Sequence, residues 1–189
     1  LATALPTDRA IVTYSGSGYS NSGLQFQPAA TAIGGSINSK VSTAQQNRLD
    51  TPSTTDGSSV LAYLRGDRSG ETAGTYRSRA HLLGDIINAE PVVIRSPSNF
   101  FIDSGYSAFK TAQSGRTKIV VQPANDGMVH MFNGTTGAEN WAYIPNLLLD
   151  TSDPASSSTS VLNLLSRKTY SHRMFIDATP FVGDADLNN

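Results

Sequence analysis

The sequence predicts a mainly β fold with short helices. Apolar runs of strand length alternate with segments rich in Gly, Pro, Ser, Thr and Asn, which interrupt regular structure. Three or four short helical stretches occur, but they do not alternate with strands as in a doubly wound sheet. The clearest single unit is residues 125–141, NDGMVHMFNGTTGAENW, where two apolar runs flank a Gly-rich loop and predict a β-hairpin.

Composition excludes several classes of protein. The chain has 189 residues, no cysteine and a net charge of -1. It therefore holds no disulfide framework, thiolate metal site or cysteine nucleophile. Basic and acidic residues are balanced and no basic run occurs, which argues against a nucleic-acid footprint or a polybasic membrane patch. The chain starts without a basic leader region and ends on GDADLNN, so we expect a piece of a longer protein.

The first third of the chain predicts two strands and two helices. Strands are expected over residues 8–15 and 24–28, joined by a Gly/Ser-rich loop. Ser42 is the expected N-cap of a first helix. A second helix over residues 58–66 places its apolar residues on one face and ends at Gly66.

The middle of the chain predicts a strand, a helix and a second strand. The strand at residues 91–94 opens on a proline, whose missing N–H is tolerated there. A helix over residues 103–116 would be capped by Ser104 and stopped by Gly115. Residues 118–124, KIVVQPA, then form a buried strand.

The hairpin follows, and the end of the chain is more varied. Its first strand has mostly apolar residues on both faces, so both faces are expected to be covered. Residues 151–160, TSDPASSSTS, predict a surface loop with little structure. Residues 161–167 predict a short helix, and residues 174–185 a strand, a bend and another strand.

Four motifs occur in a fixed order along the chain. They are LRGD at residues 64–67, RSRAHLLGDIINAEPV at 77–92, ANDGMVHMFNGTTGAENWAYIP at 124–145 and YSHRMFIDATP at 170–180. In order and spacing they resemble the β-propeller region of the type IV pilus tip-associated adhesin family, the PilY1/PilC proteins. The resemblance covers roughly residues 61–184, and the first sixty residues match only loosely.

The resemblance implies a partial β-propeller. Residues 1–189 would be a fragment of a propeller domain, with residues 1–60 as an entry segment and residues 61–189 as blades carrying the LGDI and NDGM motifs. A closed ring takes at least four blades of four strands, so these would be the first blades of a larger propeller.

The resemblance also implies a non-enzymatic component of the type IV pilus tip. Its expected roles are adhesion to surfaces or host cells, pilus assembly and twitching motility. Its expected partners are minor pilins and host receptors such as integrins. The protein would be exported by a Gram-negative bacterium, pass through the periplasm and reach the pilus tip or outer cell surface.

The tripeptide Arg65-Gly66-Asp67 has two interpretations. Integrins recognise this tripeptide on an exposed turn, which would make it an adhesive motif. Alternatively, Arg65 and Asp67 cap and pair at a helix end while Gly66 supplies a positive φ. We favour the structural interpretation, because LRGD also recurs as a local structural pattern.

Calcium is the one cofactor that the sequence suggests. Asp184, Asp186 and Asn188 place oxygen side chains at positions 1, 3 and 5 of a calcium-loop spacing. The family resemblance implies calcium-dependent pilus function, although position 6 is Asn189 where a calcium loop has glycine. A polar Asx turn is the favoured alternative.

The remaining polar residues are assigned structural roles. In Asn125-Asp126-Gly127, Asp126 is expected to accept backbone N–H bonds in a tight turn, with Gly127 at positive φ. The three histidines have no ligand spacing and are expected to be structural. An internal ion-pair set is predicted from Arg77, Arg79, Asp85 and Asp177.

Two alternative functions stay open. TGAENW resembles the TG-x-x-x-W ending of blades in pyrroloquinoline quinone dehydrogenases, which are propeller enzymes. Those enzymes repeat the motif, whereas Trp141 is the single tryptophan here and is expected to pack between neighbouring blades. The second alternative is a periplasmic scaffold propeller without an adhesive role.

Overall fold

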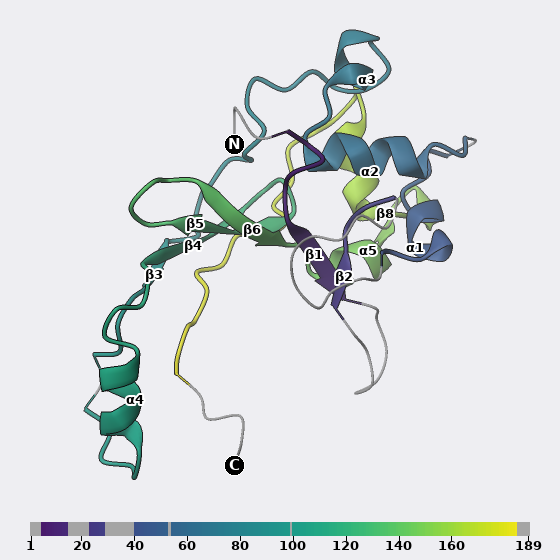
Figure 1. The fold of residues 1–189 in the computed structure, drawn as a ribbon. Coiled ribbons are helices and arrows are strands. Elements are labelled where there is room, and N and C mark those ends of the chain that lie inside the picture. The colour runs from purple at the N-terminus through teal and green to yellow at the C-terminus, as the bar shows by residue number, and fades with distance from the viewer. Residues whose placement is uncertain (1–4, 15–22, 29–39, 53, 99, 185–189) are drawn as a thin grey trace.

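The computed structural model describes residues 5–14, 23–28, 40–52, 54–98 and 100–184. Within these ranges a six-stranded sheet crosses the molecule in the order β2-β1-β6-β5-β4-β3 (Figure 1). Most of the helices gather beside the β1 end of the sheet, while α4 extends from the β3 end. The strands are β1 (Ile11–Tyr14), β2 (Gly23–Gln25), β3 (Val92–Ile94), β4 (Ile119–Ala124), β5 (Met128–Asn133) and β6 (Glu139–Tyr143).

Strands β3 to β6 form an antiparallel meander with the four strands of one propeller blade. The predicted hairpin is its β5–β6 pair, in which His130 lies opposite Ala142. Strand β1 joins the free edge of β6 in parallel, and β2 pairs with β1. The predicted mainly β fold with short helices is confirmed, and a four-stranded antiparallel meander is the unit from which propeller blades are built.

Local sequence signals place the first two helices. Helix α1 (Thr43–Asn47) begins at Ser42, whose hydroxyl accepts from Gln45 N while the Gln45 side chain accepts from Ser42 N. This reciprocal capping box confirms the predicted N-cap. Helix α2 (Gly57–Arg65) ends at Gly66, whose φ of 114° only glycine adopts at little cost.

The hydrophobic core lies where the β1 end of the sheet meets α2, α5 (Asn146–Asp150) and the 3-10 helix η1 (Val161–Ser166). A short helix α3 (Ser69–Thr72) follows α2 outside this core. The largest fully buried apolar side chains are Tyr63, Phe26, Ile11, Leu49, Leu61, Met128, Ile144, Leu149 and Leu162. These residues come from both halves of the chain, so the entry segment and the blade share one core.

Helix α4 (Tyr106–Ala112) differs from the prediction at both ends. It begins after Gly105, which has a φ of 91°, and the predicted cap Ser104 makes no capping bond. The helix ends at Ala112, before Gly115. A left-handed glycine thus sets the start, where a serine was expected.

The prediction of an unstructured loop at residues 151–160 is wrong. Strands β7 (Ser152–Asp153) and β8 (Ser156–Ser160) pair there as a hairpin. Asp153 and Ser160 are buried against partners: Asp153 Oδ1 accepts from Ala155 N, Asp153 Oδ2 lies 2.7 Å from Arg167 Nη2 as an ion pair, and the Ser160 hydroxyl donates to Leu148 O. Composition alone cannot show that polar side chains have such partners.

Two further expectations fail in the described residues. Residues 174–184 contain no strand; hydrogen bonds to side chains, such as the one that Phe175 N donates to Asn125 Oδ1, hold this segment instead. On β5, Met128 and His130 are buried, whereas Phe132 on the same face and the residues of the other face are half-buried. Trp141 is 39% exposed, so its packing against a neighbouring blade stays a prediction.

None of the helices in the described ranges is long and apolar enough to cross a bilayer.

Candidate functional site

The turn at Asn125-Asp126-Gly127 connects β4 to β5 and organises its surroundings. Gly127 has a φ of 85°, and Asp126 Oδ1 accepts from Met128 N at 3.1 Å. The predicted structural turn is therefore confirmed. Asn125 Nδ2 also donates to Asp85 Oδ2, and Asn125 Oδ1 accepts from Phe175 N. The turn thus fastens two segments that are distant in the sequence.

Residues 80–85, which include the first three residues of the LGDI motif, cross this turn; we call this segment the strap. Gly84 N donates to Asp126 Oδ2 at 3.0 Å, and Asn125 N donates to Asp85 O at 3.0 Å. A Cβ on Gly84 would lie 2.2 Å from Asp126 N. Glycine is needed here because two backbone segments approach each other closely, not because φ is positive.

His130 lies on β5 directly beneath the turn and is fully buried. Its Nε2 is 3.0 Å from Asp126 Oδ2, and its Nδ1 is 2.7 Å from Glu139 Oε1. Burial lowers the pKa of His130, but the charges and hydrogen bonds of Asp126 and Glu139 outweigh it and raise the pKa to about 9. Both ring nitrogens therefore carry protons and donate to carboxylates.

Arg9 completes this buried ionic cluster, which consists of Arg9, Asp126, His130 and Glu139. Arg9 Nε is 2.7 Å from Glu139 Oε2, and Arg9 Nη1 donates to Arg65 O at 2.8 Å. Burial raises the pKa of Glu139, but His130 and Arg9 outweigh it and lower the pKa to about 2. Through Arg9 the cluster joins the NDGM and LRGD segments.

Arg65 is turned inward. Arg65 is only 3% exposed. Its guanidinium donates to the carbonyl oxygens of Phe26, Pro6 and Arg9. Burial and the neighbouring charge of Arg9 lower the pKa of Arg65 to about 10, so it stays charged at neutral pH.

This geometry bears directly on the two interpretations of Arg65-Gly66-Asp67. The adhesive interpretation requires Arg65 to be accessible to a receptor, but Arg65 is buried in this fold. Gly66 ends α2 with a positive φ, as the structural interpretation expects. The expected pairing of Arg65 with Asp67 is wrong, because Asp67 instead accepts from Ser69 N.

The predicted ion-pair set of Arg77, Arg79, Asp85 and Asp177 is also wrong. Arg79 pairs with Glu71 at 2.7 Å, and Asp85 pairs with His172 at 2.8 Å. The other two, Arg77 and Asp177, bind Leu165 O and Asn88 N respectively. The four residues are structural, but each has a different partner.

The calcium prediction falls mostly outside the described residues, because Asp186 and Asn188 are not among them. Asp184 is described, and it pairs with Arg116 at 3.2 Å and accepts from the Tyr106 hydroxyl. Within the described ranges, no three His, Asp or Glu side chains group as metal ligands do. Calcium binding stays a prediction.

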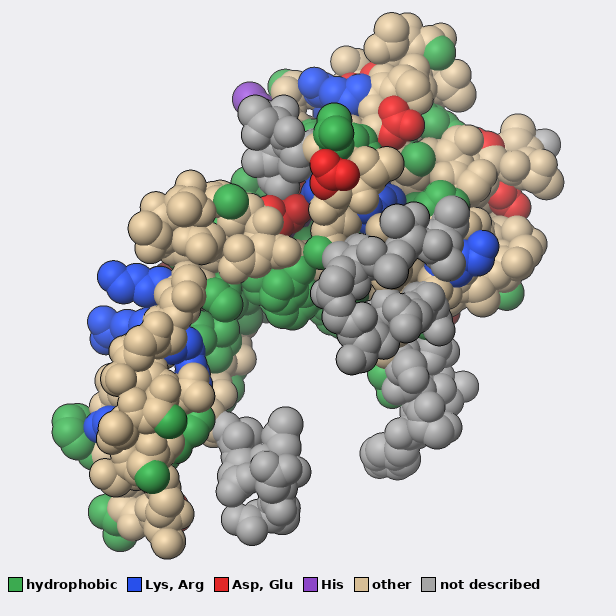
Figure 2. All heavy atoms as spheres, viewed as in Figure 1, with side chains coloured by type: hydrophobic (Ala, Val, Ile, Leu, Met, Phe, Trp, Pro, Cys, Tyr) green, Lys and Arg blue, Asp and Glu red, His purple; other side chains and the backbone are tan. Residues whose placement is uncertain are grey.

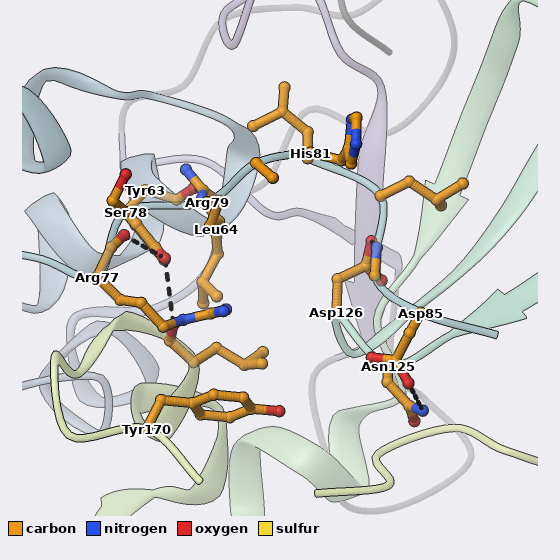
Figure 3. Close-up of a pocket in the computed structure, with 15 residues that line it drawn as sticks. Tyr63, Leu64, Arg77, Ser78, Arg79, His81, Asp85, Asn125, Asp126 and Tyr170 are labelled. Carbon is orange, nitrogen blue, oxygen red and sulfur yellow. Dashed lines mark hydrogen bonds between the residues drawn. The ribbon is translucent and has the colours of Figure 1, made fainter. Parts of the chain in front are cut away.

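A cavity of about 230 Å³ lies between the strap, α2 and the turn (Figure 3). On one wall the Arg77 guanidinium lies 4.3 Å from the centre of the Tyr170 ring, and Arg79 lies 3.6 Å from that of Tyr63. Asp126 and Asp85 lie on the opposite wall. Each of these charged groups already binds another side chain or the backbone outside this set, so the cavity is a recess suited to contact more than to proton transfer.

Sequence reasoning missed Arg9 and Glu139. Each lies in a strand segment with an ordinary mixture of polar and apolar residues. Their contact spans 130 positions, and no spacing rule connects residues so far apart. Only an aligned set of relatives would have carried a signal.

The ionic cluster predicts a maximum of stability at mildly acidic pH. His130 binds its proton more tightly in the folded chain, so its contribution is complete below about pH 6.5 and lost as pH rises toward about 9. Glu139 binds its proton more weakly, so its contribution is complete above about pH 4.5 and lost as pH falls toward about 2. The free energy of unfolding should therefore peak between about pH 4.5 and 6.5.

Urea unfolding followed by circular dichroism over a series of pH values measures this. The His130→Gln variant serves as the control, because it should lose the decline on the alkaline side. Equal unfolding free energies at about pH 5.5 and about pH 9 would show that His130 is not held protonated.

A family model and the similar sequences of known proteins point to the same family. The family model of the PilY1 β-propeller domain matches residues 83–189. A type IV pilus biogenesis factor PilY1 homolog of Xylella fastidiosa is 40% identical over 94 residues, which is 45% of this chain and 8% of that protein. The type IV pilus biogenesis factor PilY1 of Pseudomonas aeruginosa strain PAK is 34% identical over 141 residues, covering 69% of this chain and 11% of that protein.

The chain spans about a tenth of the length of these relatives. No solved structure matches it. The matched region of the family model begins in the strap and contains the whole β3–β6 meander, including Asp126, His130 and Glu139.

Proposed function

The chain belongs to the PilY1 β-propeller family, and from that membership we propose that it contributes blades to a type IV pilus biogenesis factor that acts by binding. The observation that carries this proposal is the overlap between the family match and the four-stranded meander with its ionic cluster.

The geometry of the ionic cluster supports binding in preference to catalysis. Arg9, His130 and Glu139 are buried and oriented toward one another. A catalytic acid or base has to reach a substrate proton, and these groups are already engaged in mutual hydrogen bonds. Their effect is to hold the turn and the strap rigid, which leaves loops and exposed faces as the recognition surface.

Adhesion to surfaces or host cells and a position at the pilus tip are part of the same proposal. Minor pilins are the partners that a biogenesis factor would contact during pilus assembly and twitching motility. Any adhesive contact would use surfaces other than Arg65, because its guanidinium already binds three carbonyl groups. Calcium at residues 184–188 would have to compete with Arg116 for Asp184.

Immunogold labelling of the producing cells with antibody against this chain tests the location. We expect label at pilus tips or on the outer surface, and none there on a mutant without pili. Label confined to the periplasm of cells that make pili would contradict a tip adhesin and favour a periplasmic scaffold.

A further inference from the structure

The connection between β3 and β4 forms a projecting arm, defined here as residues 95–98 and 100–118. Ile94 and Ile119 are paired neighbours, although the chain leaves the sheet between them. Antiparallel neighbours need a loop of only about 2–5 residues. Loops much longer than that are usually functional. The arm carries α4 and extends away from the rest of the molecule (Figure 1).

The arm has an ordered aromatic centre of its own. Tyr106 lies edge-on to Phe101, with ring centres 5.0 Å apart, and Phe109 lies 5.7 Å from Tyr106. The Arg116 guanidinium lies over Phe109 and also pairs with Asp184, which fastens the arm to the C-terminal segment. These contacts hold the arm in one shape rather than leaving it as loose chain.

Three consecutive large apolar residues of the arm face solvent. Phe100 is 94% exposed, Phe101 54% and Ile102 100%. Scattered exposed apolar residues are ordinary, but a contiguous group marks a surface that contacts something apolar.

The arm that carries this apolar group is basic. The arm contains four basic residues and one acidic residue, Asp103, which gives it a charge of +3 although the whole chain carries -1. The basic residues are Arg95, Lys110, Arg116 and Lys118. In Figure 2 blue side chains gather on the part of the arm nearer the sheet and hydrophobic side chains lie toward its far end. Lys110 Nζ lies 5.1 Å from the centre of the Phe100 ring. No basic run marks this region in the sequence, because the fold brings the two ends of the arm together at the β3–β4 pair.

We propose that this arm binds the surface of a lipid bilayer that contains anionic lipids. Phe100 and Ile102 would enter the boundary between headgroups and acyl chains, and Arg95 and Lys118 would lie at the level of the headgroups. Exposed aromatic and aliphatic residues next to basic ones are the composition that favours this position. An apolar group of three residues is small for a protein interface, which buries about 800 Å² per partner, whereas the positive charge around it matches an anionic surface.

Sedimentation of the whole 189-residue chain with vesicles tests the proposal. The vesicles are phosphatidylcholine alone or phosphatidylcholine mixed with phosphatidylserine. We expect binding to the mixed vesicles that weakens as salt is added, because salt screens the attraction. The Arg95→Gln/Lys118→Gln double variant should bind about 25-fold more weakly, since each basic residue near the surface contributes about fivefold. The Phe100→Ser/Ile102→Ser double variant should lose at least about tenfold, since each side chain leaves the apolar layer.

Leu147→Ser is the matched control, because Leu147 is 73% exposed on α5, at the other end of the sheet. It should bind mixed vesicles as the unchanged chain does, and circular dichroism should show that every variant is folded. Equal binding to both vesicle types, or no loss in either double variant, would overturn the proposal. Loss of self-association in the Phe100→Ser/Ile102→Ser variant without any vesicle binding would instead identify the arm as a protein interface.

Discussion

The Glu139→Ala variant is expected to lose about 3–5 kcal/mol of the free energy of unfolding, the range found when one partner of a buried ion pair is removed. Glu139 is the carboxylate shared by Arg9 and His130, at 2.7 Å from each. Its removal leaves two buried cations with only Asp126 as a counter-charge. We expect the pKa of His130 to fall in this variant, because only Asp126 then opposes the effect of burial.

Urea unfolding at about pH 5.5, where the cluster is complete, measures the loss. The matched control is Glu139→Gln, which keeps the size and one acceptor and should therefore lose less than the alanine variant. The decline of stability on the alkaline side should become smaller in Glu139→Ala, because His130 has lost one of the two carboxylates that raise its pKa. A loss below about 1 kcal/mol would show that the cluster contributes no more to the free energy of unfolding than an ordinary surface ion pair. That result would contradict its role in holding the turn.

The Arg65→Ala variant is expected to lose about 3 kcal/mol or more, because it leaves three carbonyl oxygens without their donor and each buried one costs about 1–3 kcal/mol. Those carbonyls belong to Phe26, Pro6 and Arg9. The guanidinium thus fastens the entry segment to the end of α2. Arg65→Lys should recover only part of the loss, since one ammonium group cannot reproduce the spread of a guanidinium.

Asp67→Ala separates this structural role from an adhesive one. Asp67 makes a local bond to Ser69 N, so its removal should change the unfolding free energy by less than about 1 kcal/mol. If the tripeptide were an integrin ligand, Asp67→Ala and Arg65→Ala would both abolish binding to immobilised integrin, and Asp67→Ala would do so while fully folded. We expect no such loss in Asp67→Ala, and its observation would restore the adhesive interpretation.

Elements governed by local rules were predictable from the sequence. The hairpin of β5 and β6 follows from two apolar runs around a Gly-rich loop, and α1 from the serine that caps it. Gly66 and Gly127 fall where a positive φ is needed. In each case the residues that determine the structure lie within a few positions of one another, so pattern and propensity are sufficient.

The failed predictions have two physical causes: partners supplied by distant segments, and a glycine that turns the backbone where a serine cap was expected. Residues 151–160 were expected to be a loop because their side chains are polar, yet Asp153 and Ser160 are buried against partners from other segments. Ser104 was expected to cap α4, yet the backbone turns at Gly105 instead. Polarity indicates exposure only while no partner is present, and partners are supplied by the tertiary structure.

The sequence by itself determined the mainly β class, the hairpin, the first helices and, through its ordered motifs, the family. Only the tertiary structure decided that Arg65 lies inside, that Arg9, His130 and Glu139 meet, and that a basic arm exposes an apolar group. The reason is that hydrogen-bonding patterns and caps depend on neighbouring residues, whereas burial and charge pairing depend on which distant segments the fold brings together. Arg9 and Glu139 are 130 positions apart in the chain and 2.7 Å apart in the protein.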